Sequence, residues 1–156
     1  MNSRYEDKFK AGAQQYLDAG EQVITAFIAQ PRGSGQAMSG NLIAGEIGGR
    51  QARKARASGE ATGLIVSRPM ALAVTPRHVL TLKISSPFLG RGGEVKELLS
   101  KVPIEDVDGV RVRRFGLAKR ITVTVGGQNV ELEGNVGATE FADAFERAKA
   151  AAPQAA

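Results

Sequence analysis

The chain has 156 residues, of which 42% are hydrophobic, and this is enough for one domain over residues 1–156 with a packed core. It has no cysteine, which excludes disulfide scaffolds, thiolate metal sites and cysteine nucleophiles. Its formal net charge of +5 favours anionic partners, but only weakly. No stretch approaches the roughly 18 consecutive apolar residues of a membrane span, and the first residues lack the basic-then-apolar order of a signal peptide, so we expect a cytoplasmic protein.

The first predicted element is a helix over residues 3–18. Ser3 and Glu6 have the spacing of a capping box, in which each side chain bonds the backbone N–H of the other residue. The apolar residues that follow recur at helical spacing, and a glycine stands where a left-handed C-terminal cap is expected. Residues 21–30 then alternate as in a strand, and Pro31 ends that strand.

An insertion is predicted at residues 32–63, because this segment is rich in glycine and poor in β-branched residues. We interpret it as partly helical or mobile, and as the least ordered internal part of the chain, since glycine costs entropy to fix. Gly45 and Gly49 have the spacing of a small-xxx-small contact. The large apolar residues of the insertion are Met38, Leu42, Ile43 and Ile47, and its basic residues are Arg50, Arg53, Lys54 and Arg56.

A hairpin is predicted at residues 68–84, directly after the insertion. Pro76 marks its turn, because proline fixes φ and cannot donate to a ladder. Leu80, Leu82 and Ile84 alternate with more polar positions, which predicts a strand buried on one face.

Four more strands and a helix complete the predicted fold. The strands are expected at residues 94–102, 107–115, 120–125 and 129–133. The first of these segments has a pattern that also fits the start of a helix, and a Gly-Gly pair forms a tight turn before the last. The closing helix covers residues 138–151, and its apolar stripe of Phe141, Phe145 and Ala148 is expected to plug one open end of the sheet.

This element order predicts a mainly β fold with α-helices. Its β core spans residues 21–134 as a seven-stranded bent sandwich or partly open barrel. The C-terminal helix caps the core, and the N-terminal helix precedes it.

Five segments together resemble bacterial pleckstrin-homology-like (PH-like) and GRAM-type domains over most of residues 17–150. They are Leu17-Asp-Ala-Gly-Glu-Gln-Val23, Ala73-Val-Thr-Pro-Arg-His-Val-Leu80, Val102-Pro-Ile-Glu-Asp-Val107, Lys119-Arg-Ile-Thr-Val-Thr-Val125 and Phe141-Ala-Asp-Ala-Phe145. The resemblance implies a seven-stranded bent sandwich with a C-terminal capping helix, used as a non-catalytic binding or assembly module with a habit of self-association. Phosphoinositide recognition is not carried over, because the insertion swells the relevant loop and no lysine closes the first strand. Richness in Ala, Gly, Val and Arg favours an actinobacterial source.

Residues that often carry chemistry have ordinary interpretations in this chain. His78 has no evident serine or cysteine partner, so it is interpreted as a residue at the start of a strand. Glu105, Asp106 and Asp108 lack the glycine-punctuated loop of a cation site and are interpreted as a solvated turn. Residues 90–93 lack the ending of a P-loop. We therefore expect no catalytic residue, no metal and no cofactor.

Two basic groups are the candidate binding residues. In the insertion, Arg50, Arg53 and Lys54 share one helical face, and Arg56 follows. With the apolar residues Met38, Leu42, Ile43 and Ile47 nearby, this group fits either an anionic membrane surface or a solvated basic segment. The second patch is Arg111, Arg113, Arg114, Lys119 and Arg120, a possible anion site whose charges could instead pair with Glu131 and Glu133.

The leading functional prediction is a PH-like module that works through protein–protein contacts and self-association. In this homo-oligomer the insertion supplies an apolar interface with arginines at its rim. The first alternative is a peripheral adaptor at the inner face of an anionic membrane, held by the basic insertion. The second alternative is a nucleic-acid-associated protein, although interleaved aromatics are missing.

Overall fold

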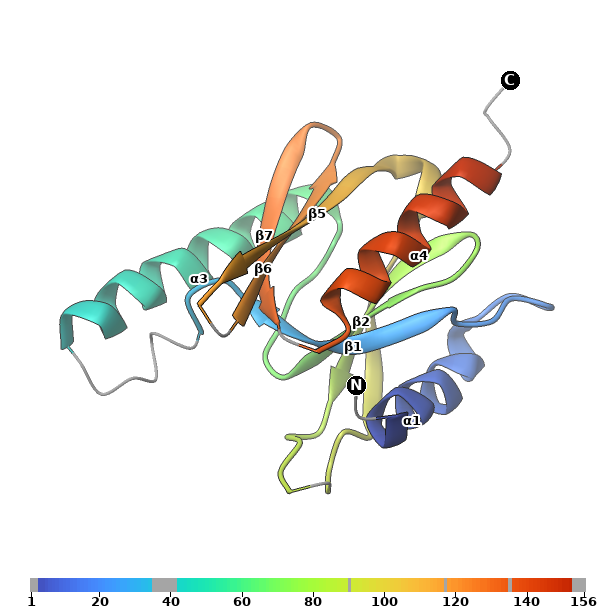
Figure 1. Cartoon of the computed structure of the whole chain (residues 1–156), viewed down its shortest axis with the longest axis horizontal. Helices are drawn as coiled ribbons and strands as arrows, with labels where there is room; N and C mark the ends of the chain where they lie inside the picture. The colour runs from blue at the N-terminus through green and yellow to red at the C-terminus, as the bar shows by residue number, and fades with distance from the viewer. Residues whose placement is uncertain (1–2, 35–41, 90, 117, 135, 153–156) are drawn as a thin grey trace.

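The computed structural model describes residues 3–34, 42–89, 91–116, 118–134 and 136–152, and its architecture is mainly β with α-helices (Figure 1). Seven antiparallel strands form one sheet in the order β4-β3-β2-β1-β7-β6-β5, which is not closed into a barrel. The strands are β1 (Thr25–Pro31), β2 (Met70–Val74), β3 (His78–Ile84), β4 (Val95–Pro103), β5 (Val107–Phe115), β6 (Ala118–Val125) and β7 (Gln128–Gly134). The helices are α1 (Ser3–Ala13), α3 (Leu42–Thr62) and α4 (Ala138–Ala151), with short 3-10 helices η1 (Gln14–Tyr16) and η2 (Ile104–Asp106).

β1 joins the two halves of the sheet. Its first part, Thr25 to Ala29, pairs with β2, and its last part, Ala29 to Pro31, pairs with β7. The strands β2–β4 and β5–β7 consequently form two wings that run in different directions in Figure 1. This arrangement confirms the predicted sandwich-like class, with seven strands and a helix at each end.

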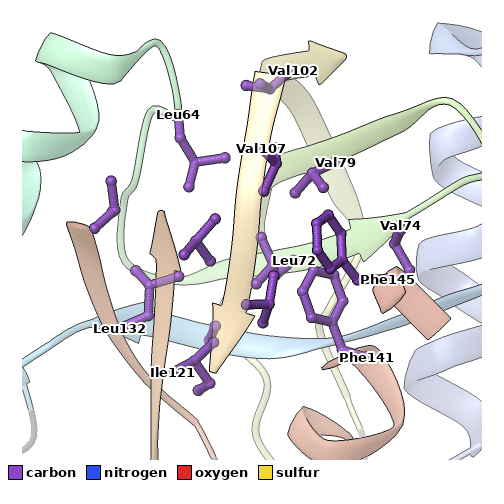
Figure 2. Packing of buried hydrophobic residues seen from close by; sticks show 14 of the residues in the cluster. Leu64, Leu72, Val74, Val79, Val102, Val107, Ile121, Leu132, Phe141 and Phe145 are labelled. Carbon is purple, nitrogen blue, oxygen red and sulfur yellow. The ribbon is translucent and has the colours of Figure 1, made fainter. Parts of the chain in front are cut away.

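The main hydrophobic core lies between the two wings and α4 (Figure 2). Phe141 and Phe145 are fully buried in it, as their four-residue spacing on one helix face predicted. The ring of Phe141 packs against that of Phe27 on β1, with centroids 5.4 Å apart. Leu132 on β7 and Ile121 on β6 complete the same cluster. α4 therefore joins both wings to β1.

A second core lies under α1, on the other face of β2 and β3. Phe9 and Ala13 of α1 pack there with Leu80, Leu82 and Ile84. Since Val79 belongs to the main core, β3 is buried on both faces and the prediction of one buried face is wrong. The cause is the main core, which covers the face of Val79 that the periodicity within β3 assigned to water, whereas α1 covers the predicted apolar face.

The N-terminal boundaries differ from the prediction. α1 ends at Ala13 rather than residue 18, and β1 begins at Thr25 rather than residue 21. Between them, Glu21 N–H donates to Asp18 carbonyl at 3.0 Å, which forms a turn. The turn draws the Glu21 side chain inward, so these residues do not extend β1.

The remaining strands lie at nearly the positions that the strand and turn patterns of the sequence predicted. β4 confirms the strand interpretation of residues 94–102 over the helical one. Gly126 and Gly127 have φ of 57° and 79° in the turn between β6 and β7, a conformation that favours glycine. These local signals needed no knowledge of the tertiary structure.

The insertion contains the long helix α3, so the partly helical interpretation is correct for residues 42–62. The buried residues of α3 are spaced by four, three and four positions along the helix, and they are Gly48, Ala52, Ala55 and Gly59. This small-residue stripe packs α3 against β7 and β1. A Cβ on Gly33 would lie 2.4 Å from the Gly48 carbonyl oxygen, so the two segments touch through their backbones. The described contact uses Gly48. A Cβ on Gly49 would lie 3.5 Å from the Arg53 side chain, and the surroundings of the predicted Gly45 lie outside the described part of the chain.

Candidate binding surfaces

The outer face of α3 is basic. Because the small-residue stripe turns toward the sheet, the residues between its members point to solvent. Arg50, Arg53, Lys54 and Arg56 are all exposed, and none forms an ion pair with another described residue. The structure thus places the first predicted basic group together on one helix, with Glu46 and Glu60 exposed toward its ends.

The apolar group predicted beside these cations is described only at Ile47, whose side chain is 46% exposed. Met38 lies outside the described residues, and so do the side chains of Leu42 and Ile43. The proposed apolar interface stays a prediction at those three positions. On the described part of α3, the solvent face is charged rather than apolar.

The second basic patch is divided between two strands. On the edge strand β5, Arg111, Arg113 and Arg114 are exposed. On β6, Lys119 and Arg120 are only half-exposed. The register places Arg113 opposite Arg120 and Arg114 opposite Lys119. Because adjacent residues of a strand point to opposite faces, Arg111, Arg113 and Arg120 share one face of the sheet, and Arg114 and Lys119 share the other. The structure therefore divides the predicted patch between two faces.

The basic residues of β6 have closer polar neighbours than those of β5. Lys119 donates from Nζ to Oγ1 of Thr139 on α4 at 3.0 Å. Arg120 stands opposite Glu133 in the register of β6 and β7. The other predicted acid, Glu131, instead forms an ion pair with Arg32 at 2.5 Å.

Sequence reasoning did not identify the buried carboxylate of Glu21, which is 2% exposed. Glu21 accepts hydrogen bonds from Oγ1 of Thr75 at 2.5 Å and from the backbone N–H of Asp18 at 3.0 Å. Nδ1 of His78 lies 2.6 Å from its Oε2. Burial opposes ionisation, but the hydrogen bonds from His78, Thr75 and the Asp18 backbone outweigh it and lower the pKa of Glu21 to about 2.

The Glu21 network has the residue types of a metal site, yet a cation of the protein already occupies it. Ligand atoms of Asp18, Glu21 and His78 lie within 4.8 Å of one another. Nζ of Lys101 is 3.1 Å from the Asp18 carboxylate and 3.7 Å from that of Glu21. The ammonium group supplies the positive charge that these carboxylates need, so the network is interpreted as structural.

The same network explains the positions of two segments on which the family resemblance depends. Glu21 comes from residues 17–23, and Thr75 and His78 come from residues 73–80. Their contacts fasten the entry of β1 to the turn between β2 and β3, and Lys101 adds β4. The residues of the Glu21 network therefore lie within the quoted segments. Their role became visible only through contacts between residues more than 50 positions apart in the sequence.

The acidic residues at the start of β5 do not converge. Glu105, Asp106 and Asp108 are exposed, and Oδ2 of Asp108 accepts a hydrogen bond from the Gly127 N–H at 2.8 Å. Within the described parts of the chain, they form no group whose ligand atoms meet. Their arrangement agrees with a solvated turn.

An exposed apolar tip in the β3–β4 loop was also not identified from the sequence. Phe88 and Leu89 are 71% and 85% exposed. The tip is held in place, because Phe88 and Arg91 exchange two backbone hydrogen bonds of 2.9 Å and Tyr5 Oη donates to the Arg91 carbonyl at 3.0 Å. Pro87 and the glycines that follow it predict a loop, but their pattern does not predict an apolar tip.

Comparison of the chain with protein-family models and with curated proteins found no match. None of the helices in the described residues is long and apolar enough to cross a membrane. The PH-like resemblance consequently stays a prediction.

Proposed function

We propose that this chain is a non-catalytic, PH-like binding and assembly module that acts through protein–protein contacts, with the outer face of α3 as its main binding surface. The observation that carries the proposal is the row of exposed cations on α3, which have no ion-pair partner among the described residues. The seven strands and the plug formed by α4 support the PH-like part, since the resemblance implies a seven-stranded sandwich capped by a C-terminal helix.

The charge of this surface favours an acidic partner. Arg50, Arg53 and Arg56 lie three residues apart, so their guanidinium groups follow one side of the helix. Arginine forms bidentate hydrogen bonds with carboxylates, and clustered cations speed the encounter with an acidic surface. A protein surface rich in Asp and Glu is therefore the partner class that fits best.

A protein partner is favoured over a membrane by the way α3 is used. A helix lying in a membrane interface needs an exposed apolar face opposite its cations. The face of α3 opposite its cations packs on β7 and β1, and Ile47 is the one large apolar side chain exposed on the described part of the helix. This arrangement leaves little apolar surface for lipid.

Binding to poly-glutamate tests the proposal, because this probe carries carboxylates without lipid or phosphate. We expect the variant R50E/R53E/R56E to lose salt-sensitive binding, since it reverses three charges on α3. The matched control R111E/R113E/R114E has the same change in net charge on β5 and should retain most of the binding. Circular dichroism and melting curves check that both variants fold.

Two outcomes would replace the proposal. Equal losses in the two variants would mean that net charge, and not α3, governs binding. Retention on phosphatidylserine vesicles or on duplex DNA through α3, without binding to poly-glutamate, would favour the membrane or the nucleic-acid alternative.

A further inference from the structure

α4 presents an acidic face that complements α3. Because Phe141, Phe145 and Ala148 turn into the core, the opposite side of α4 faces solvent. The exposed acids on that side form no ion pair with a described residue, and they are Glu140, Asp143 and Glu146. Each copy of the chain thus carries one basic helix face and one acidic helix face, both without ion pairs among the described residues.

The charges on the two faces also match in spacing. Along α3, three bases follow one another at steps of three residues: Arg50, Arg53 and Arg56. Along α4, read backwards, three acids follow one another at the same steps: Glu146, Asp143 and Glu140. All six residues are exposed. Both rows extend about 9 Å at the helical rise of about 1.5 Å per residue, so each arginine can face one carboxylate.

The charges that flank the two rows do not select a direction for the helices. With the middle members of the rows opposed, an antiparallel alignment places Arg147 opposite Gly49, one helical turn from the acid Glu46. A parallel alignment places Arg147 opposite Ala57, one helical turn from the acid Glu60. The pairing of three bases with three acids is the same in both alignments, and this pairing carries the proposal.

We propose that the basic face of α3 of one copy docks on the acidic face of α4 of a second copy. The inference rests on the proposed function, because it names the occupant of the α3 surface. Figure 1 shows α3 and α4 on opposite sides of strands β5–β7, so the contact is heterologous and each copy has two different faces to offer. Repetition of such a contact gives a head-to-tail chain or a ring.

The contact is weak by itself and sensitive to salt. Each exposed ion pair typically changes an equilibrium constant by about 1.4- to 5-fold. We expect a mass that rises with protein concentration at ~50 mM salt and returns to that of the monomer at ~0.5 M, where the Debye length is below about 5 Å.

A charge-swap experiment by analytical ultracentrifugation tests the pairing. The variants R50E/R53E/R56E and E140K/D143K/E146K should each stay monomeric at low salt, because each carries two faces of like charge. Their equimolar mixture should associate again, since the acidic α3 of one variant now faces the basic α4 of the other. The control R111E/R113E/R114E should associate as the wild type does. Neutral variants, D143N/E146Q and R50Q/R53Q, serve if a reversal fails to fold, and each should lower the association constant.

Several results would overturn the inference. They are a wild type that stays monomeric at low salt, association that neither reversal weakens, and a mixture that does not recover association. A monomeric wild type that still binds poly-glutamate through α3 would remove the second copy as occupant and leave the proposed function intact. If charge reversal on α3 changed neither poly-glutamate binding nor self-association, both the proposed function and this inference would be wrong.

Discussion

At the scale of single residues, the Glu21 network shows how a buried charge fixes a local conformation. Its carboxylate has a hydroxyl, a backbone N–H and an imidazole nitrogen within hydrogen-bond distance, and an ammonium group lies nearby. A buried ion whose partners are complete is tolerated, whereas removal of one partner leaves the others unsatisfied. The geometry of the β1 entry depends on this set of contacts.

We predict that Glu21→Gln lowers the free energy of unfolding at pH 7 by about 3–5 kcal/mol, the usual cost of breaking a buried pair. The pKa of Glu21 is lowered from 4.5 to about 2 in the folded protein, so its ionised form stabilises the fold above pH 4.5. This contribution is lost as the pH falls from 4.5 toward 2. The difference between wild type and Glu21→Gln should therefore be smaller at about pH 3 than at pH 7, as urea unfolding can measure.

The matched control for this prediction is Glu105→Gln, which changes an exposed carboxylate. It should leave the unfolding free energy nearly unchanged at either pH. A stability difference for Glu21→Gln that is the same at low and at neutral pH would show that the ionisation of Glu21 does not contribute.

At the scale of elements, α3 and α4 dock in different ways. α4 buries large aromatic rings between the two wings, and its periodicity is plain in the sequence. α3 docks through glycine and alanine, which permit close backbone approach but bury little apolar surface. The first mode stabilises the core, and the second holds a helix on the outside with its cations facing solvent.

We predict that Phe145→Ala lowers the free energy of unfolding by about 3–5 kcal/mol, because it leaves a cavity in the main core. Thermal or urea unfolding measures the loss, and the exposed neighbour Glu146→Ala is the control. A melting curve of Phe145→Ala that matched the wild type would contradict the role of α4 as a plug.

We predict that Ala55→Lys detaches α3, whereas Ala57→Lys does not. Ala55 is 3% exposed and faces the sheet, so a lysine there cannot keep its charge hydrated without moving the helix. Ala57 is exposed on the same helix and has the same propensity change. Amide hydrogen exchange over residues 46–62 should rise strongly in the first variant and little in the second. Equal exchange in the two variants would contradict the packing of the small-residue stripe.

At the scale of the whole molecule, the features found from the sequence are those that local patterns encode. The closing helix with Phe141 and Phe145, and the turn at Gly126 and Gly127, needed only residue spacing and glycine conformation. The basic face of α3 was found for the same reason, because its arginines recur at helical spacing.

The features that the sequence could not supply depend on distant contacts. The burial of Glu21 requires Thr75 and His78, and the burial of the Val79 face of β3 requires the main core. The extent of α3 was underestimated because a docking stripe of small residues has no hydrophobic periodicity to detect.

The most direct test of the central claim, that the outer face of α3 is the binding surface, is a map of backbone amide shifts during titration with poly-glutamate at low salt. We predict that the shifts concentrate on residues 46–60 and are absent from β5 between residues 107 and 115. Shifts that centre on β5, or that spread evenly over the exposed cations of the molecule, would contradict the claim.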